Sequence, residues 1–306
     1  MSSSTAGTAG KSEPLSRSRT VARELVHRTS VAEVLLTDVR RTDTPDLFAA
    51  AASWPRAHAT FPRDGSQRHS PLILVETLRQ LGLYIPLRFY AVPAACHAVI
   101  TDLYFRLAPG SAPPAHSGAT EVTCHARVSA VRRSTHHGVC ALRLDAVFTV
   151  CGLPFGQGGG GVRFLSEAQY RALRGRTAQV AVAVPSPDGA HRPPAAVLAV
   201  NHPQDAVLAV AGDGLLLAPA DPLHPFLFDH PTDHVPGMAL LEAARQAASY
   251  SSGGTLRRPR AGRMKAVRFT ELAPPARVLC TQYDSLCVFR VTQGGTRTAY
   301  GTLSYQ

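Results

Sequence analysis

The sequence predicts an α+β fold of two similar domains, in each of which one apolar helix packs against an antiparallel sheet. Two stretches, 71–81 and 234–248, are apolar nearly all round and carry a proline at or near their start, as is typical of buried helices. Each stretch is followed by a series of strand-like segments. Polar residues of the same type recur in both halves at one fixed spacing, which indicates duplicated domains.

The repeat is defined by three polar residues within each apolar helix and by one histidine in the loop before it. The same distance along the sequence separates the two members of each pair: Glu76 and Glu242, Arg79 and Arg245, Gln80 and Gln246, and His58 and His224. Helix positions i, i+3 and i+4 share one face, so each helix carries a polar strip. Buried ionisable groups cluster at functional sites, whereas an ion pair that only supports the helix is the alternative interpretation.

The first half is predicted to begin with a disordered tail over residues 1–23, which are rich in Ser, Thr, Ala and Arg and lack the apolar run of a signal peptide. The first domain spans 24–175, with a short helix at Val31–Leu36, a strand at Leu47–Trp54 and the apolar helix Pro71–Leu81. Four strands and a closing helix follow: His97–Leu107, Glu121–Arg132, Val139–Cys151, Phe155–Leu165 and Ser166–Arg174.

The second half repeats this order after a linker over 176–194, where prolines and glycines gather. The second domain spans 195–306. The strands expected before its helix are Val197–Val200, Ala206–Ala211 and Leu215–Ala218. Those expected after it are Met264–Leu272, Arg277–Tyr283, Cys287–Thr292 and Thr296–Tyr305.

Composition narrows the class of protein. No segment reaches the about 18 uninterrupted apolar residues of a membrane span, so we predict no membrane contact and a cytoplasmic location. The six cysteines include no C-x-x-C pair, and we expect reduced, mostly buried thiols. The net charge of +11 could attract nucleic acid, a phosphorylated small molecule or an acidic carrier protein. Because no nucleic-acid-binding motif accompanies the arginines, we predict no nucleic acid partner.

The sequence predicts neither a metal site nor a cofactor site. Three histidines, His224, His230 and His234, precede the second helix, but their spacing is not that of a metal site, and we expect the last two to order the loop. The run Gly156–Gly161 fits the pattern G-x-G-x-x-G but lacks an acidic residue about 20 positions on, which favours a glycine-rich strand turn over a dinucleotide site.

Three motifs carry a resemblance to a known family: residues 25–29 (LVHRT), residues 71–80 (PLILVETLRQ) and residues 233–246 (DHVPGMALLEAARQ). They resemble the A-factor synthase (AfsA-type) family of γ-butyrolactone biosynthesis, which consists of tandem hotdog proteins. The loop histidine and the helix acid also resemble those of hotdog dehydratases, although the gap from His224 to Glu242 is wider. The resemblance implies two hotdog domains, each a sheet wrapped round a long helix, that pair as an intrachain pseudo-dimer.

The resemblance implies acyl transfer without a cofactor: a β-ketoacyl group moves from acyl carrier protein to the hydroxyl of dihydroxyacetone phosphate. A carboxylate in an apolar helix has a raised proton affinity, so Glu242 or Glu76 is the expected general base. Arginine suits phosphate binding, which gives Arg245 and Arg79 a substrate-holding role.

Further site residues are expected around the same helices. The glutamines Gln246 and Gln80 are expected beside the substrate, and the backbone N–H groups of Gly237 and Met238 could stabilise the thioester oxyanion. The histidines His224 and His58 are either catalytic, as in dehydratases, or hydrogen-bonded to the backbone of their loops. The second helix begins at Pro-Gly, and we therefore expect the working pocket to contain Glu242 and Arg245.

Two other functions stay open at this point. The same fold could act as a thioesterase or dehydratase on acyl thioesters. The positive charge also leaves open a non-catalytic regulator that binds a lactone or DNA. The sequence does not decide the acyl chain length, the final lactone or furan product, whether one or both pockets are active, or whether the chain forms a homo-oligomer.

Overall fold

The computed structural model describes residues 14–61, 67–111, 113, 115, 118–134, 138–175, 189–212 and 214–305. The linker expected over 176–194 lies largely outside this range. So does the first part of the predicted tail, but residues from 14 onward contact the sheet: the Ser16 N–H donates to Asp38, and Arg17 donates to Thr123. This part of the predicted tail is therefore folded against the first domain.

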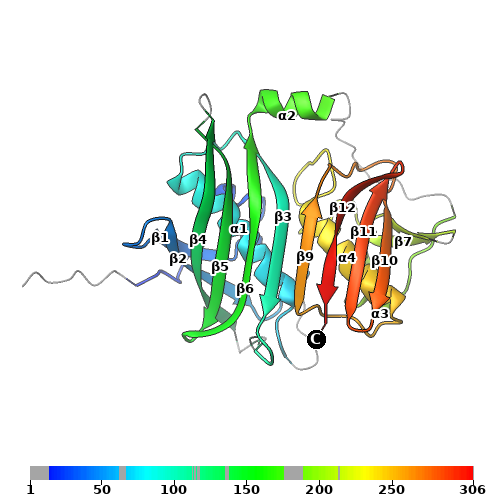
Figure 1. Ribbon diagram of the computed structural model, residues 1–306. Helices are drawn as coiled ribbons and strands as arrows, with labels where there is room; N and C mark the ends of the chain where they lie inside the picture. The colour runs from blue at the N-terminus through cyan, green and yellow to red at the C-terminus, as the bar shows by residue number, and fades with distance from the viewer. Residues whose placement is uncertain are drawn as a thin grey trace, which may run out of the picture.

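The strands form one antiparallel sheet of twelve members in the order β1-β2-β4-β5-β6-β3-β9-β12-β11-β10-β8-β7 (Figure 1). The first six come from the N-terminal half and the last six from the C-terminal half. The bounds are β1 Leu36–Arg41, β2 Leu47–Pro55, β3 His97–Leu107, β4 Ala119–Ser134, β5 Gly138–Val150, β6 Leu153–Leu165, β7 Leu208–Ala211, β8 Gly214–Leu217, β9 Ala261–Ala266, β10 Arg277–Tyr283, β11 Leu286–Gln293 and β12 Thr296–Ser304.

The two halves join edge to edge at β3 and β9, where Asp102 pairs with Lys265 and Tyr104 pairs with Arg263. Backbone hydrogen bonds thus continue from one half into the other and leave no exposed edge at the junction. The predicted intrachain pseudo-dimer is confirmed in this arrangement.

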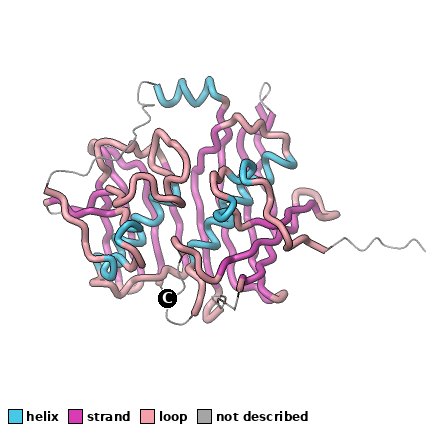
Figure 2. Tube along the Cα trace, turned by 180° about the vertical axis from the view of Figure 1, so that it is seen from behind, coloured by secondary structure: helices cyan, strands magenta, loops and turns pink. Residues whose placement is uncertain are grey.

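The two long helices lie on the same face of the sheet, one in each half, as the view from behind shows (Figure 2). They are α1 (Pro71–Phe89) and α4 (Gly237–Ser251). The shorter helices are α2 (Glu167–Arg174), α3 (Ala195–Leu198), and the 3₁₀ turns η1 (Arg23–Val26), η2 (Val31–Glu33) and η4 (Pro203–Asp205). Each half therefore consists of a sheet that packs on one apolar helix.

Helix α1 is longer than predicted. Ser70 caps its start by accepting from the Leu72 N–H, and Pro71 occupies the first turn. The helix continues past the predicted end, through Gly82 and Pro86, which both disfavour a helix interior. Burial of Leu83 and Ile85 against the core offsets that cost.

Three segment predictions were wrong. Val197–Val200 is not a strand: the chain forms the helical turn α3 there, which follows Pro194 and is bonded to α4 through the Val197 carbonyl and Ser249. The helix expected over Val31–Leu36 is only the turn η2, and the next residues form the polar edge strand β1. The segment after Ala266 leaves the sheet, so β9 is shorter than expected.

The cysteine prediction was wrong in two respects. Cys280 and Cys287 are joined by a disulfide, because the β10–β11 hairpin folds one strand back beside the other, which a search for C-x-x-C does not detect. Of the remaining cysteines only Cys124 is buried, whereas Cys151 is exposed.

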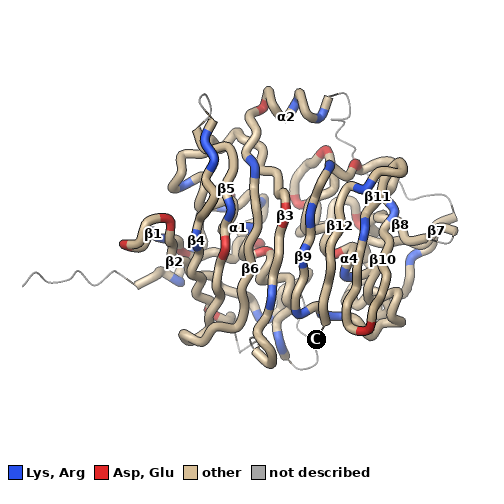
Figure 3. Tube along the Cα trace, viewed as in Figure 1, with Lys and Arg blue, Asp and Glu red and all other residues tan. Residues whose placement is uncertain are grey.

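Lysine and arginine are spread over strands of both halves (Figure 3) rather than gathered over one element. In the described part of the chain, no helix combines the length and the apolar character that a membrane crossing requires.

Candidate functional site

On α4, the predicted polar strip forms one closed network. Arg245 donates from Nε and Nη2 to the two carboxylate oxygens of Glu242, at 2.8 and 2.6 Å. The Gln246 amide donates to the same carboxylate and to the Asp205 carbonyl, and its oxygen accepts from the Val207 N–H. The strip thus ties the helix to the segment that precedes β7.

On α1 the network is repeated atom for atom. Arg79 donates from Nε and Nη2 to Glu76 at 2.8 and 2.9 Å. The Gln80 amide donates to Glu76 and to the Glu33 carbonyl, and its oxygen accepts from the Leu35 N–H. Both glutamine amides are therefore bonded to the protein itself, and neither lines the two cavities described below.

The two loop histidines are also equivalent to each other. Nδ1 of His58 accepts from the backbone N–H groups of Thr60 and Phe61, and Nδ1 of His224 accepts from those of Phe226 and Leu227. The opposite nitrogen, Nε2, lies 3.2 Å from Glu33 in the first case and 3.1 Å from Asp205 in the second. Nδ1 of each ring is thus bonded to its own loop and Nε2 lies beside a carboxylate, as expected of histidines that order their loops.

The repeat breaks at Arg28, which makes a second ion pair with the Glu76 carboxylate. Its Nη2 lies 3.0 Å from Glu76, and its Nη1 donates to the Phe226 carbonyl. Arg79 donates to the Val26 carbonyl and Arg245 donates to the Leu198 carbonyl, so Val26 and Leu198 are equivalent. Two residues further along the chain, the equivalent of Arg28 is Val200. Among the described residues, Glu76 consequently has two guanidinium partners and Glu242 has one.

This asymmetry changes the expected chemistry of Glu76. Burial alone would raise the pKa of its carboxyl group, but Arg79 and Arg28 together hold that pKa below its ordinary value. The side chain is fully buried and lines neither of the two cavities described below. The prediction of a raised proton affinity was wrong for this residue, because neighbouring charges outweigh desolvation.

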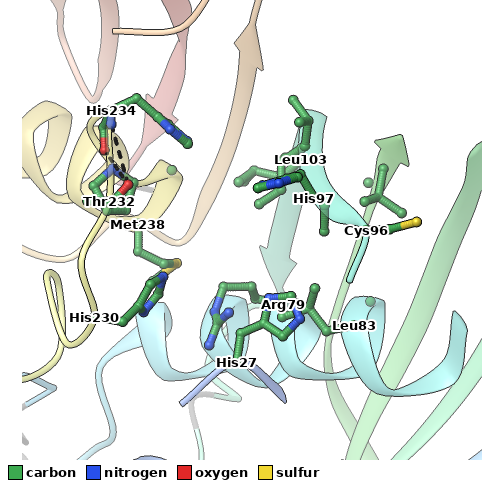
Figure 4. Close-up of a pocket in the computed structure, with 18 of the residues that line it drawn as sticks. His27, Arg79, Leu83, Cys96, His97, Leu103, His230, Thr232, His234 and Met238 are labelled. Carbon is green, nitrogen blue, oxygen red and sulfur yellow. Dashed lines mark hydrogen bonds between the residues drawn. The ribbon is translucent and has the colours of Figure 1, made fainter. Parts of the chain in front are cut away.

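A large cavity, about 690 Å³ in volume, lies between α1, β3, β6 and the loop before α4. This volume is in the range of small-molecule sites. His27, Arg79 and His230 lie at one end of the cavity, the polar end, whereas His97 and His234 lie across from them on other walls (Figure 4). The remaining wall is largely apolar.

A smaller cavity, about 310 Å³, lies beside α4 and is lined by Glu242, Arg245 and His224. By contrast, Gly237 and Met238 line the larger cavity together with Arg79. Glu242 and Arg245, expected in the working pocket, thus line one cavity, and Gly237 and Met238, expected at the thioester oxyanion, line the other. The first turn of α4 lies at the larger cavity, whereas Glu242, one turn further along the helix, lies at the smaller one.

Arg79 differs from Arg245 in one functional respect. Arg245 uses all three nitrogens on the protein, because its Nη1 donates to the Arg257 carbonyl at 3.3 Å. Nη1 of Arg79 has no hydrogen-bond partner in the described part of the chain, while Nε and Nη2 are held by Glu76. The larger cavity thus has a fixed guanidinium with one donor left for a ligand.

His27 stands beside Arg79 at the polar end (Figure 4) and was not singled out as a site residue from the sequence. Its φ of 50° lies in the left-handed region, which costs energy for a residue other than glycine and recurs at functional sites. Burial, together with Arg79, His230 and His97, lowers the pKa of His27 to about 4. The ring is therefore neutral at physiological pH, and the guanidinium of Arg79 beside it favours an anion.

Two aspartate–histidine pairs lie on the loop before α4 and face the same cavity. Nδ1 of His230 lies 2.7 Å from Asp229, and Nδ1 of His234 lies 2.7 Å from Asp233. Asp229 is itself buried, and His230 and Arg28 hold the pKa of its carboxyl group below the ordinary value although burial opposes them. Each pair fixes a ring through Nδ1, and Nε2 has no partner among the described residues. Both histidines were predicted only to order the loop.

Helix α2 closes one side of the cavity. His97 stacks on Tyr170 at 3.8 Å and lies 2.7 Å from Glu167, and the Tyr170 hydroxyl donates to Asp233 at 2.6 Å. Arg174 donates to the same aspartate. These contacts anchor the loop before α4, and hence its histidines, to the first half. Among the described residues, no group of three or more His, Cys, Asp or Glu is placed to hold a metal ion.

Residues 10–164 and 210–264 match a family model described as the A-factor biosynthesis hotdog domain. The chain belongs to this family. A member from Streptomyces virginiae, named 2-oxo-3-(phosphooxy)propyl 3-oxoalkanoate synthase, is 35% identical over 84% of this chain and 85% of its own length. A protein of the same name from Streptomyces coelicolor is 31% identical over 92% of this chain and 90% of its own.

Solved structures confirm the hotdog fold of this family member. The acyl-ACP thioesterase from Bacteroides thetaiotaomicron has a TM-score of 0.52 at 10% identity and covers 87% of this chain and 100% of its own. The 12:0-ACP thioesterase from Umbellularia californica has a TM-score of 0.50 at 12% identity, over 87% of this chain and 99% of its own. Identities this low show the fold alone.

Proposed function

We propose that the protein transfers a 3-oxoacyl group from the thioester of acyl carrier protein to the hydroxyl of dihydroxyacetone phosphate. The name of the Streptomyces relatives describes the ester that this reaction forms, a 3-oxoalkanoate of 2-oxo-3-(phosphooxy)propanol. Both substrates are components of the cytoplasm, where we expect the protein to work.

We place the reaction in the larger cavity. Nη1 of Arg79 is bonded to no described residue and lies beside His27 at the polar end, and this observation decides the choice. The remaining wall of the cavity is largely apolar. Such a cavity has a place for a phosphate and a place for an acyl chain. The equivalent donor of Arg245 in the smaller cavity is bonded to Arg257.

The residues around Arg79 suit a phosphate group. Glu76 holds Nε and Nη2, so the guanidinium presents Nη1 in a fixed direction, and bonding between a charged donor and phosphate is stronger than between neutral groups. His27 adds a neutral ring at the same end. We therefore assign Glu76 to positioning Arg79 rather than to proton transfer.

For the transfer step, the hydroxyl oxygen of the triose phosphate attacks the thioester carbonyl carbon. The new C–O bond forms, the C–S bond breaks, and the hydroxyl proton passes through a base to the leaving thiolate. His230 is the proposed base, because Asp229 holds its Nδ1 and leaves Nε2 to accept the proton. The backbone N–H groups of Gly237 and Met238, at the start of α4, are proposed to stabilise the oxyanion.

This assignment exchanges the roles expected of the two helices. We propose that Glu242, Arg245 and Gln246 hold the second half together, as Glu76 and Gln80 do in the first. His58 and His224 are assigned to ordering their loops, because Nδ1 of each ring accepts from the backbone of its own loop and Nε2 lies beside a carboxylate.

The test is a transfer assay with purified protein and a 3-oxoacyl thioester of acyl carrier protein, with and without dihydroxyacetone phosphate. We expect thiol release that depends on the triose phosphate, and a phosphorylated ester as product. Thiol release that is unaffected by the triose phosphate would indicate a thioesterase instead. No thioester consumption under either condition would refute the transferase.

A further inference from the structure

Part of the wall of the larger cavity is aliphatic, and we call this part the apolar arm. Six aliphatic side chains from α1 and three strands line it: Val75, Leu78, Leu83, Leu103, Leu144 and Val162. Removal of aliphatic chain from water is favourable in proportion to the area buried. A wall of this kind suits the hydrocarbon part of an acyl group.

Gly82 is the position in this wall where a side chain is missing. It lies inside α1, shortly after Arg79, and belongs to the cavity lining. A Cβ atom added there would meet no atom within 4 Å, so the position borders open space. Glycine inside a helix is destabilising relative to alanine, and packing does not require it at this position.

The repeated helix supports this interpretation independently. The residue at the equivalent place in α4, by the spacing that relates Glu76 to Glu242, is Ala248, which is only 1% exposed. The same helix in the same fold thus accepts a side chain at this position. The two positions differ in their surroundings: Gly82 lines the larger cavity, whereas Ala248 does not line the smaller cavity of the second half.

We propose that Gly82 determines the length of acyl chain that the protein accepts. This inference rests on the proposed function. The chain lies along the apolar arm, and part of it occupies the space beside Gly82. A side chain at position 82 would project into that space between Arg79 and Leu83 and would shorten the arm.

The experiment compares wild type with Gly82→Leu on a series of straight-chain 3-oxoacyl N-acetylcysteamine thioesters, with dihydroxyacetone phosphate as acceptor. Each methylene that can no longer be buried should lower kcat/KM by about fourfold. We therefore expect a progressive loss with long chains and little change with the shortest. Gly82→Ala should give a smaller shift in the same direction and keep the helix, whereas Leu83→Ala should favour longer chains.

Arg88→Leu is the matched control, because it adds the same side chain to an exposed position of α1 outside the cavity. It should leave the chain-length profile unchanged. An equal loss for all chain lengths in Gly82→Leu, or an unchanged profile in both Gly82 variants, would overturn the proposal.

A binding measurement separates failure of this inference from failure of the proposed function. Non-reactive thioether analogues of these thioesters, in which a methylene group replaces the thioester carbonyl, are titrated into wild type and Gly82→Ala by calorimetry. If the wild type transfers nothing, the proposed function fails. A length-dependent change of Kd in the variant would still support the acyl arm at Gly82, and equal Kd values in both proteins would refute it.

Discussion

Replacement of Glu76 by glutamine should destabilise the protein more than replacement of Glu242, although both residues occupy the same place in a repeated network. Glu76 is fully buried and pairs with Arg28 at 3.0 Å and with Arg79 at 2.8 Å. Glu242 is 13% exposed and pairs with Arg245 alone among the described residues. The first substitution therefore takes a carboxylate from two guanidinium groups, of which Arg28 keeps Asp229 at 3.4 Å, and the second takes it from one.

The magnitude follows from the number of charged partners. A hydrogen bond to a charged group contributes about 1.5–3 kcal/mol, and breaking a buried ion pair costs about 3–5 kcal/mol. Two partners place Glu76→Gln at roughly 4–6 kcal/mol. One partner, with some solvent, places Glu242→Gln at roughly 2–3 kcal/mol. At about 2–4 °C per kcal/mol, the two values of Tm should differ by several degrees.

The assay is thermal and urea unfolding of both variants, followed by circular dichroism. Arg28→Val alone reproduces the second half, where Val200 stands in place of Arg28 beside an intact glutamate. The variant to compare with the two singles is the double variant Glu76→Gln with Arg28→Val. The double variant should lose less free energy of unfolding than the two single variants lose together, because without Arg28 one buried positive charge no longer needs the Glu76 carboxylate. Equal Tm values for the two single glutamine variants, or additivity in the double variant, would refute the account of the asymmetry.

Two further predictions concern the polar end of the cavity. The pKa of His27 is lowered to about 4, so between pH 6.5 and 4 the unfolded chain binds a proton that the folded chain does not. The free energy of unfolding should therefore be fully retained above about pH 6.5 and fall by about 2–3 kcal/mol as the pH drops towards 4. Urea midpoints measure this, and His27→Gln should lose this pH dependence. His230→Gln should lower kcat of transfer by about 10²–10⁴-fold while Tm stays near wild type, since this side chain is 48% exposed. His224→Gln should do the reverse, and a large loss of kcat in a folded His224→Gln variant would show that the wrong histidine has been chosen.

Much of the fold was predictable because it depends on local pattern. The strand His97–Leu107 and the strand Arg277–Tyr283 were predicted with the bounds that the structure shows, since both are rich in strand-forming residues and end at turns. The repeat at one fixed spacing located both helices and their polar strips. Boundaries failed where tertiary burial overrides propensity, as at Gly82 within α1.

The role of Arg28 was not predictable from the repeat, for a definite reason. Glu33 and Asp205 are equivalent by their contacts to His58 and His224, but they lie further apart in the sequence than the two histidines do. The hairpin of β1 and β2 is longer than that of β7 and β8, so the register of the repeat shifts before the helices. A comparison at one fixed spacing therefore does not align Arg28 with Val200.

The polar side chains that line the cavity could not be assembled from the sequence either. His27, His97 and His230 come from three distant segments, and the pairing of β3 with β9 and the anchoring of the loop by Tyr170 bring them together. The glycine run Gly156–Gly161 was expected to form a strand turn, but it lies inside β6, and part of it forms cavity wall.

The central claim is that the cavity beside α1, and not the one beside α4, binds the phosphorylated acceptor. The most direct test is KM for dihydroxyacetone phosphate in Arg79→Lys and Arg245→Lys, which keep the charge and disturb equivalent networks. Loss of one charge-assisted bond of about 1.5–3 kcal/mol predicts a KM at least about tenfold higher in Arg79→Lys. Arg245→Lys should stay near wild type. A raised KM in Arg245→Lys with an unchanged KM in Arg79→Lys would contradict the assignment.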